Sequence, residues 1–283
     1  MNGPSARGFT LLEVLITLLL TGFTMVTVYQ LYLSAQKTVL AQEEVVELQQ
    51  NLRIAMERLT RDLRMAGFLV FTRYPPLQTA PHNPDADNPL ILHTASPSGD
   101  SARLAAPVRV QSSQMTFSLT SPAMVELFAV DDKVRLFRPV DQSQPLDKYF
   151  RVVSRQPMDS SITLDGFDPT SNISYQVGDL LVPAASYPGT ITYYLKDAEL
   201  FSRHSDGHTQ RITAKNEVGG TLVNGLTVFE LAYVTDDGTV LHTVPTADLE
   251  VIRTVQVTLT GQVQNSKGTK LRSLRKVIAL RNR

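Results

Sequence analysis

The stretch Arg7-Gly8-Phe9-Thr10-Leu11-Leu12-Glu13 opens a long apolar run near the N-terminus of this chain. Between Phe9 and Leu33, Glu13 is the only charged residue. As an α-helix, these roughly 25 residues span about 37 Å, which is enough to cross a hydrocarbon core of ~30 Å. Because the run is too long for an ordinary secretory signal, and no Ala-x-Ala-like site follows it, the sequence predicts a membrane-spanning helix over 9–33. Residues 1–8 are a polar leader.

Glu13 is an unusual residue for a membrane span. A carboxylate in a spanning helix costs on the order of 2.5–3.5 kcal/mol and normally has a partner. If a peptidase cuts the chain after Gly8, the free amine of Phe9 is a positive charge about one helical turn from Glu13. The amine of one chain and Glu13 of a neighbour can then neutralise each other where packing excludes water. The alternative is a plain signal anchor with a chance glutamate.

Leader, small residue, aromatic residue and glutamate occur here at the spacing of type IV pilin and pseudopilin precursors, and the chain resembles this family. The resemblance implies that prepilin peptidase cuts between Gly8 and Phe9 and N-methylates Phe9. It implies that Arg7 helps to hold the leader in the cytoplasm, and that Glu13 recruits the incoming subunit. Gly22 matches a glycine often found in pilin stems.

The same resemblance implies a location and a set of partners. The location is the inner membrane, crossed once, with the C-terminal domain in the periplasm or outside, before incorporation into a pilus or pseudopilus. The partners are prepilin peptidase, other minor pilins, the major pilin, the inner-membrane assembly platform and membrane lipid. Two departures from major pilins, Gln30 in place of a frequent proline and the absence of cysteine, favour a minor pilin or pseudopilin.

The helical pattern continues beyond the membrane, over 34–67. Its apolar face recurs every three or four residues and consists of Val45, Leu48, Leu52, Met56, Leu59, Leu63 and Ala66. The other face carries pairs of opposite charge four residues apart, namely Arg53–Glu57, Glu57–Arg61 and Arg58–Asp62. Gly67 is a candidate left-handed stop. One helix from Phe9 to Ala66 would be roughly 87 Å long, which suits a filament stem.

The rest of the chain predicts a mostly β outer domain. We expect a Pro-rich loop with short extended pieces over 68–104, a β-rich insertion resembling a small barrel over 105–187, and a C-terminal β-sheet over 188–283. The predicted strands are Met115–Leu119, Val125–Val130, Lys133–Phe137, Tyr149–Val153, Ser161–Leu164, Thr190–Leu195, Leu200–Arg203, Leu226–Val234, Arg253–Gln262 and Leu274–Leu280. The predicted fold class is α+β, a long N-terminal helix packed on an antiparallel sheet.

Two further segments carry a narrower resemblance. The segment Arg61-Asp62-Leu63-Arg64-Met65-Ala66-Gly67-Phe68 is similar to the end of the stem in PilW-type minor pilins, and more loosely to the J-class pseudopilins of type II secretion. The order of residues from Tyr193-Tyr194-Leu195 to Leu280-Arg281-Asn282 looks like the C-terminal sheet of the PilW type. This resemblance covers roughly 1–70 and 188–283.

Composition and motifs give no sign of catalysis. The chain of 283 residues has a formal net charge of zero and no cysteine, so metal–thiolate sites are excluded, and it lacks phosphate-loop, nucleophile-elbow and zinc-helix motifs. We expect no enzyme activity, no cofactor, no metal and no small-molecule substrate. His204 and His208 with Asp206 could hold a metal, but a solvated hairpin tip is favoured. The acidic pairs Asp85/Asp87, Asp131/Asp132 and Asp236/Asp237 lack the ligand spacing of a calcium loop.

The C-terminal tail is basic. It carries Lys267, Lys270, Arg272, Arg275, Lys276, Arg281 and Arg283, with no acidic residue after Glu250. Such a stripe can bind DNA phosphates. The alternative, which we favour because the stripe has no interleaved aromatic residues, is an edge strand whose charges prevent association between sheets. We therefore expect no nucleic-acid partner.

These observations lead to one functional hypothesis with two rivals. The hypothesis is a minor pilin, cleaved and N-methylated, which joins other minor pilins to prime type IV pilus assembly or to form the pilus tip. The nearest rival is a type II secretion pseudopilin at the pseudopilus tip. A rival of another class is a membrane-anchored binding protein or adhesin whose β-rich insertion recognises a ligand.

Overall fold

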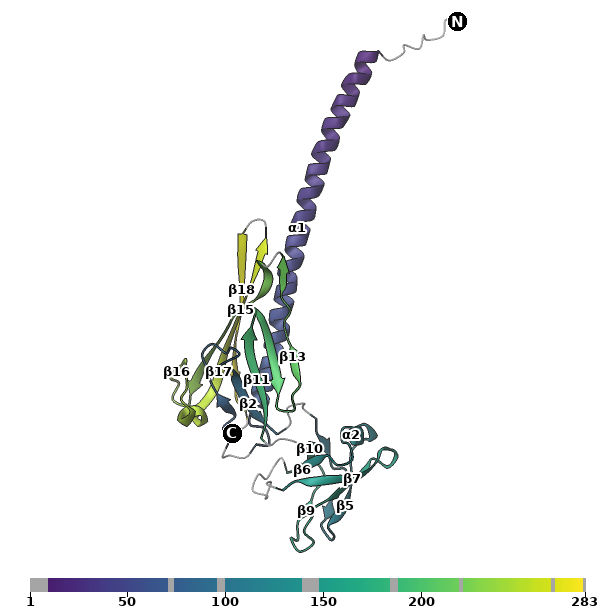
Figure 1. Cartoon of the computed structure of the whole chain (residues 1–283), viewed down its shortest axis with the longest axis vertical. Helices are drawn as coiled ribbons and strands as arrows, with labels where there is room; N and C mark the ends of the chain where they lie inside the picture. The colour runs from purple at the N-terminus through teal and green to yellow at the C-terminus, as the bar shows by residue number, and fades with distance from the viewer. Residues whose placement is uncertain are drawn as a thin grey trace, which may run out of the picture.

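The computed structural model describes residues 10–70, 74–95, 100–138, 148–183, 188–218, 221–265 and 268–281. Its longest element is the 55-residue helix α1 (Leu11–Met65), which leads into antiparallel β-sheets (Figure 1). The predicted α+β class is therefore confirmed. The predicted helix end is also confirmed, because Ala66 is the C-cap and Gly67 has a positive φ of 76°.

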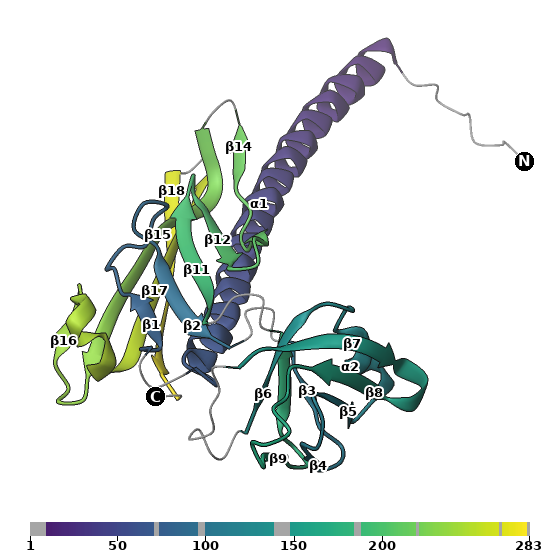
Figure 2. The same ribbon diagram turned by 60° about the horizontal axis from the view of Figure 1, so that its bottom comes forward.

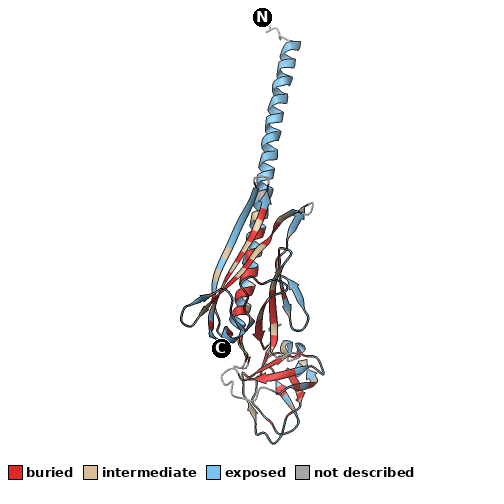
Figure 3. Cartoon of the chain, turned by 60° about the vertical axis from the view of Figure 1, so that its left-hand side comes forward, coloured by how far each residue is buried: buried red, intermediate tan, exposed pale blue. Residues whose placement is uncertain are grey.

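Only the second half of α1 is covered by the rest of the chain. Figure 3 shows a fully exposed upper half and a lower half with a buried stripe. The predicted apolar face forms this stripe: Leu59 and Leu63 have no exposed surface, and Leu48, Leu52, Met56 and Ala66 are at most 3% exposed. The predicted Arg53–Glu57 ion pair forms on the outer side, with 3.2 Å between Nε and Oε1.

Two antiparallel sheets share one hydrophobic core with α1. The strands of the first sheet, in spatial order, are β1 (Leu77–Thr79), β2 (Leu90–Thr94), β11 (Gly189–Lys196), β12 (Glu199–His204) and β13 (Thr209–Arg211). Those of the second are β14 (Asn216–Val218), β15 (Thr221–Thr235), β17 (Ile252–Asn265) and β18 (Gly268–Ala279), with β16 (Val240–Leu241) paired to β15 and the 3₁₀ helix η2 (Thr246–Val251) before β17.

A tight turn connects β11 and β12. Lys196 pairs with Glu199, so Asp197 and Ala198 form a two-residue hairpin loop, and both have positive φ. The predicted strand Arg253–Gln262 lies within β17, where Val255, Val257 and Leu259 alternate with polar residues and are fully buried.

The Pro-rich segment 68–104 was predicted as a loop with short extended pieces, and two such pieces, β1 and β2, are strands of the first sheet. Strand β2 lies inside the first sheet, between β1 and β11, and the side chains of Leu90 and Leu92 are fully buried. The prolines of this segment favoured the prediction of a loop, but no proline interrupts the short apolar run Leu90-Ile91-Leu92. Proline excludes strand pairing only at its own position, so a strand of this length fits between two of them.

A separate β-barrel lies beyond the end of α1 (Figure 2). Its strands, in order, are β3 (Ala102–Arg103), β10 (Leu180–Pro183), β6 (Lys133–Phe137), β7 (Phe150–Gln156), β8 (Ser161–Asp165) and β5 (Gln114–Ser118). The two ends of this sheet meet, because Leu104 bridges Leu119 and the amide of Ala105 donates to the carbonyl of Ser118 at 2.8 Å. The closed sheet surrounds its own core, which contains stacked aromatic rings.

The remaining elements of the barrel are the pair β4 (Val108–Arg109) and β9 (Ser174–Tyr175), the helix α2 (Pro122–Glu126) and the 3₁₀ helix η1 (Pro157–Asp159). The predicted strand Val125–Val130 was wrong. Helix α2 occupies its start, because Ser121 is the N-cap and Pro122 is preorganised for the first helical turn. The apolar Val125 and Phe128 still enter the barrel core.

A small apolar joint connects the barrel to the helix-and-sheet region. Leu69 and Ala95 come from the segments beside the end of α1, and Phe137, Leu180 and Val182 come from the barrel. All five are buried. The joint is much smaller than either core, so the two cores are distinct bodies connected by a narrow apolar contact.

Candidate functional site

The first turn of α1 holds the carboxylate of Glu13 in a reciprocal cap. The amide and the hydroxyl of Thr10 both donate to Oε2 of Glu13, at 3.0 and 3.1 Å, and the amide of Glu13 donates to the Thr10 hydroxyl at 3.3 Å. This Thr-x-x-Glu arrangement is a capping box, which satisfies two backbone donors at the helix start. The Thr-x-x-Glu spacing of this box is visible in the sequence, but no capping role was predicted for Thr10. Arg7, Gly8 and Phe9 lie outside the described residues.

The first half of α1 exposes large apolar side chains on all sides. Leu11, Leu18 and Phe23 are 82%, 69% and 75% exposed, and the same holds as far as Tyr32. A surface of this size and composition is not stable in water, so it needs lipid or the stems of other subunits around it. The helix is long and apolar enough to cross a membrane, and its most apolar window has no buried residue.

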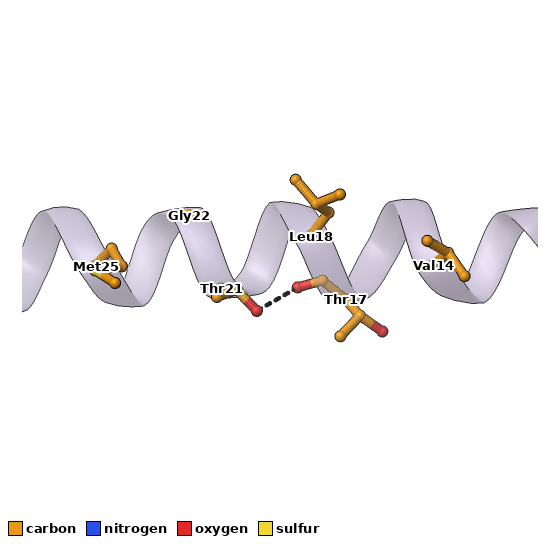
Figure 4. Close-up of a pocket in the computed structure, with 6 residues that line it drawn as sticks. All are labelled: Val14, Thr17, Leu18, Thr21, Gly22 and Met25. Carbon is orange, nitrogen blue, oxygen red and sulfur yellow. Dashed lines mark hydrogen bonds between the residues drawn. The ribbon is translucent and has the colours of Figure 1, made fainter.

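The threonines of this segment are adapted to an apolar environment. Thr17, Thr21, Thr24 and Thr27 each donate their hydroxyl to the carbonyl one turn earlier, at 2.7 to 2.9 Å. These bonds keep the hydroxyl groups satisfied without water. Thr17 and Thr21 are among the six residues that line a shallow pocket on this segment, which also includes Gly22 (Figure 4). A Cβ at Gly22 would meet nothing within 4 Å, so packing within this chain does not require a glycine there.

The comparison with protein-family models bears on this same segment. Residues 4–29 match the model of the prokaryotic N-terminal methylation motif, and the match includes Gly8, Phe9 and Glu13. The chain carries a prepilin-type N-terminus. This motif, together with the exposed apolar helix, indicates a type IV pilin-like substrate of prepilin peptidase that is anchored in a membrane. Among curated proteins, no match to this chain was found. The assignment of the cut to Gly8 and Phe9, and of assembly to Glu13, stays a prediction.

Below the exposed segment, polar contacts fix α1 against the two sheets. The hydroxyl of Tyr193 on β11 donates to the carboxylate of Asp62, and Arg58 donates to the side chain of Gln210. Burial raises the pKa of Tyr193 well above its ordinary value, and the charge of Asp62 adds to this rise. On the second sheet, Nδ2 of Asn224 donates to the carbonyl of Glu44 at 3.3 Å. Sequence spacing gave no signal for these contacts, because the partners are more than 130 residues apart.

The candidate metal ligands are engaged in local turns. His204 and His208 flank the tip of the β12–β13 hairpin, where Asp206 accepts the amide of His208 at 3.0 Å. Asp85 accepts the amides of Asp87 and Asn88. Asp237 accepts the amide of Thr239 at 3.0 Å, and hydrogen bonds from Thr235 and Thr239 lower its pKa to about 2. Within the described ranges, no group of three or more candidate ligands is close enough to hold a metal ion.

The basic tail forms the edge strand that the sequence favoured. Strand β18 ends the spatial order of the second sheet, and it pairs along its whole length with β17. Lys270, Arg272 and Arg275 are exposed. Lys267 and Arg283 lie outside the described residues.

Proposed function

We propose that this chain is a minor pilin of the PilW type, which joins other minor pilins to prime type IV pilus assembly or to form the pilus tip. The observation that carries this proposal is the combination of a methylation motif with a stem whose first half is apolar and uncovered and whose second half is covered by a sheet. A soluble protein gains nothing from such a helix, whereas a filament buries it between subunits.

In this proposal, cleavage, methylation and recruitment of a neighbouring subunit follow one another at the N-terminus. Prepilin peptidase removes residues 1–8 and methylates the amine of Phe9. The carboxylate of Glu13, which in the single chain is held by Thr10, then exchanges this partner for the charged amine of a neighbouring subunit. A charge-assisted contact in an environment without water is stronger than the cap that it replaces, so assembly is favoured. We propose that the chain works by assembly and not by catalysis.

Mass spectrometry of the mature N-terminus tests the first step. We expect a chain that begins at methylated Phe9 in cells with prepilin peptidase, and an uncut chain in cells without it. An N-terminus at Met1 or Asn2 in both strains would contradict the proposal. Depletion of pilus subunits from sheared filaments after deletion of this gene then separates a pilus role from a pseudopilus role, since a type II pseudopilin affects protein secretion instead.

A second candidate function is a membrane-anchored binding protein whose barrel recognises a ligand. The observation that favours it is the separate core of the barrel, which is connected to the stem region by only a small joint. Replacement of Ala102–Pro183 by a short linker, with Leu69 changed to Ser at the uncovered joint, tests this candidate. Assembly without adhesion would support a grafted binding module, whereas loss of assembly would favour a structural role for the barrel.

A further inference from the structure

Strand β18 runs beside α1 as the edge of the second sheet (Figure 1). Near its start it carries two exposed cations, Lys270 and Arg272, and the strand contains no carboxylate. Both cations are on the face of the sheet that meets α1, because side chains alternate along a strand and Ile278, on the same face, is buried in the core shared with α1. We call these two side chains the basic edge.

Two contacts fix the height of the basic edge along α1. Gly261 of β17 pairs with Arg272 and lies against Leu48 of α1. Asn224 of β15 is in the row of the sheet that contains the other cation, and its Nδ2 donates to the carbonyl of Glu44 at 3.3 Å. The basic edge is therefore level with the helical turn from Glu44 to Leu48.

The same part of α1 carries two exposed carboxylates, Glu43 and Glu47, on the flank away from β18. Glu47 comes 11 residues before Arg58, which is about three turns, so the two residues are only about 20° apart around the helix. Arg58 donates to Gln210 of the first sheet. The first sheet contacts β15, whereas β18 lies two strands beyond β15. This acidic flank and the basic edge are therefore on opposite sides of the stem.

The two pairs of charges also match in spacing. Glu43 and Glu47 are four residues apart on a helix, a rise of about 6 Å. Lys270 and Arg272 are two residues apart on a strand, a rise of about 6.6 Å. None of the four forms an ion pair with another residue that the structure describes. A chain of zero net charge thus presents opposite charges on two flanks at one height, without partners of its own for them.

We propose that copies of this chain associate side by side in the membrane, with Lys270 and Arg272 of one copy against Glu43 and Glu47 of the next. Charge complementarity identifies the partner as a second copy, because both halves of the contact are on this chain. Anchoring by the apolar segment supports this choice, since it holds copies parallel and at the same height.

The contact joins two different surfaces, so it is heterologous and leaves each copy a free surface for a further one. Exposed ion pairs are weak one by one, but confinement to one membrane raises the effective concentration of the copies. The inference goes beyond the proposed function, because it rests on membrane anchoring and not on the pilus role.

The absence of cysteine from the sequence allows a single fluorescent label on each chain. Met158→Cys, at a position that is 99% exposed in the barrel, takes a donor or an acceptor dye and leaves both charged surfaces unchanged. Full chains are inserted in liposomes and labelled with dyes that do not cross the membrane, so that only chains with the outer domain outside report. We expect energy transfer between copies at a low ratio of protein to lipid, and its decrease at high salt.

Charge reversal identifies the residues responsible. Glu43→Lys/Glu47→Lys gives a chain with two basic surfaces, and Lys270→Glu/Arg272→Glu gives a chain with two acidic ones. We expect the associated fraction of each variant alone to fall at least about tenfold, because like charges then face each other. An equal mixture of the two variants should recover association, because opposite charges meet again at every contact.

The matched control reverses two exposed acids of the barrel, Glu126→Lys/Asp159→Lys, and should associate as the unchanged chain does. Energy transfer that survives either reversal at the stem, or a mixture that does not recover it, would overturn the proposal. Flotation with liposomes reports whether each variant is inserted, so a failure of membrane anchoring is distinguished from a failure of the contact between copies.

Discussion

Leu48 of the stem lies directly over Gly261 of β17, so closely that a Cβ added at Gly261 would overlap Cδ1 of Leu48 and come within 3.0 Å of the carbonyl oxygen of Gly225. The glycine is therefore required by packing and not by its backbone angles. This contact lets α1 approach the sheet at the point where the stem leaves the outer domain.

Gly261→Ala should destabilise the folded domain by about 1–3 kcal/mol, because Leu48 has to move and the backbone of Gly225 limits the space. Urea unfolding of the detergent-solubilised chain, followed by circular dichroism, measures this loss. The double variant with Leu48→Ala is the control: the clash is removed there, so its cost should be smaller than the sum of the two single costs. Simple addition would mean that the two residues do not compete for space.

Tyr193→Phe should cost about 1–3 kcal/mol in the same unfolding measurement. The change removes the hydroxyl that donates to Asp62 and leaves a partly buried carboxylate with one donor fewer. Tyr194→Phe is the matched control, because the neighbouring Tyr194 stacks on Phe201 and the variant keeps that ring contact. Similar losses in the two variants would argue against a specific contribution from Asp62.

The stability of the domain should fall with acidification through His93. Burial lowers the pKa of His93 below its ordinary value of 6.5, while its Nδ1 donates to the carbonyl of Pro75. Between the lowered folded pKa and about 6.5, the unfolded chain binds a proton that the folded chain does not, so stability rises with pH across that window and is lost as pH falls through it.

Unfolding free energies from about pH 7.5 down to about pH 5 measure this effect. In His93→Gln we expect a shallower decline over that range, because the group that takes up the proton on unfolding is gone. His208→Gln provides the comparison for removal of an imidazole from the exposed hairpin tip. An unchanged decline in His93→Gln would assign the pH dependence to other groups.

Glu13→Gln should permit membrane insertion but reduce assembly by at least about tenfold, because the neutral amide cannot neutralise the amine of a neighbouring subunit. The measurement is the amount of this subunit in sheared filaments, with flotation to verify insertion. Glu57→Gln carries out the same chemical change at an exposed position of the stem. If both variants assemble equally well, Glu13 has no role in recruitment.

Asp179→Asn should destabilise the barrel by about 2–4 kcal/mol. Asp179 is 3% exposed, accepts two bonds from Arg138 at 3.2 and 3.1 Å, and accepts the amide of Gln176 at 2.8 Å. Because the barrel core is separate from the core beneath α1, calorimetry should show one transition shifted downward and the other nearly unchanged. A shift of both transitions would mean that the small joint couples the two bodies.

Elements whose signals are local could be predicted from the order of the residues. The apolar run, the three-to-four-residue spacing of Leu52, Met56 and Leu59, and the stop at Gly67 gave α1 almost to the residue. The strand predicted over Arg253–Gln262 lies within β17, and the strands predicted over Thr190–Leu195 and Leu200–Arg203 are β11 and β12. The methylation motif also lies within one short segment, residues 4–29. The periods of helices and strands and the residues of turns depend on neighbouring positions, so the local sequence is enough to predict them.

The contacts between residues far apart in the chain became known from the folded structure. Strand β2 lies among prolines and is part of the first sheet because it pairs with β1 on one side and β11 on the other. The residues near β2 in the sequence do not indicate these partners. Closure of the barrel needs Leu104 to reach Leu119, and the approach of Leu48 to Gly261 joins residues more than 200 positions apart. Such contacts depend on how whole elements fill a shared core, a condition that neighbours in sequence do not encode.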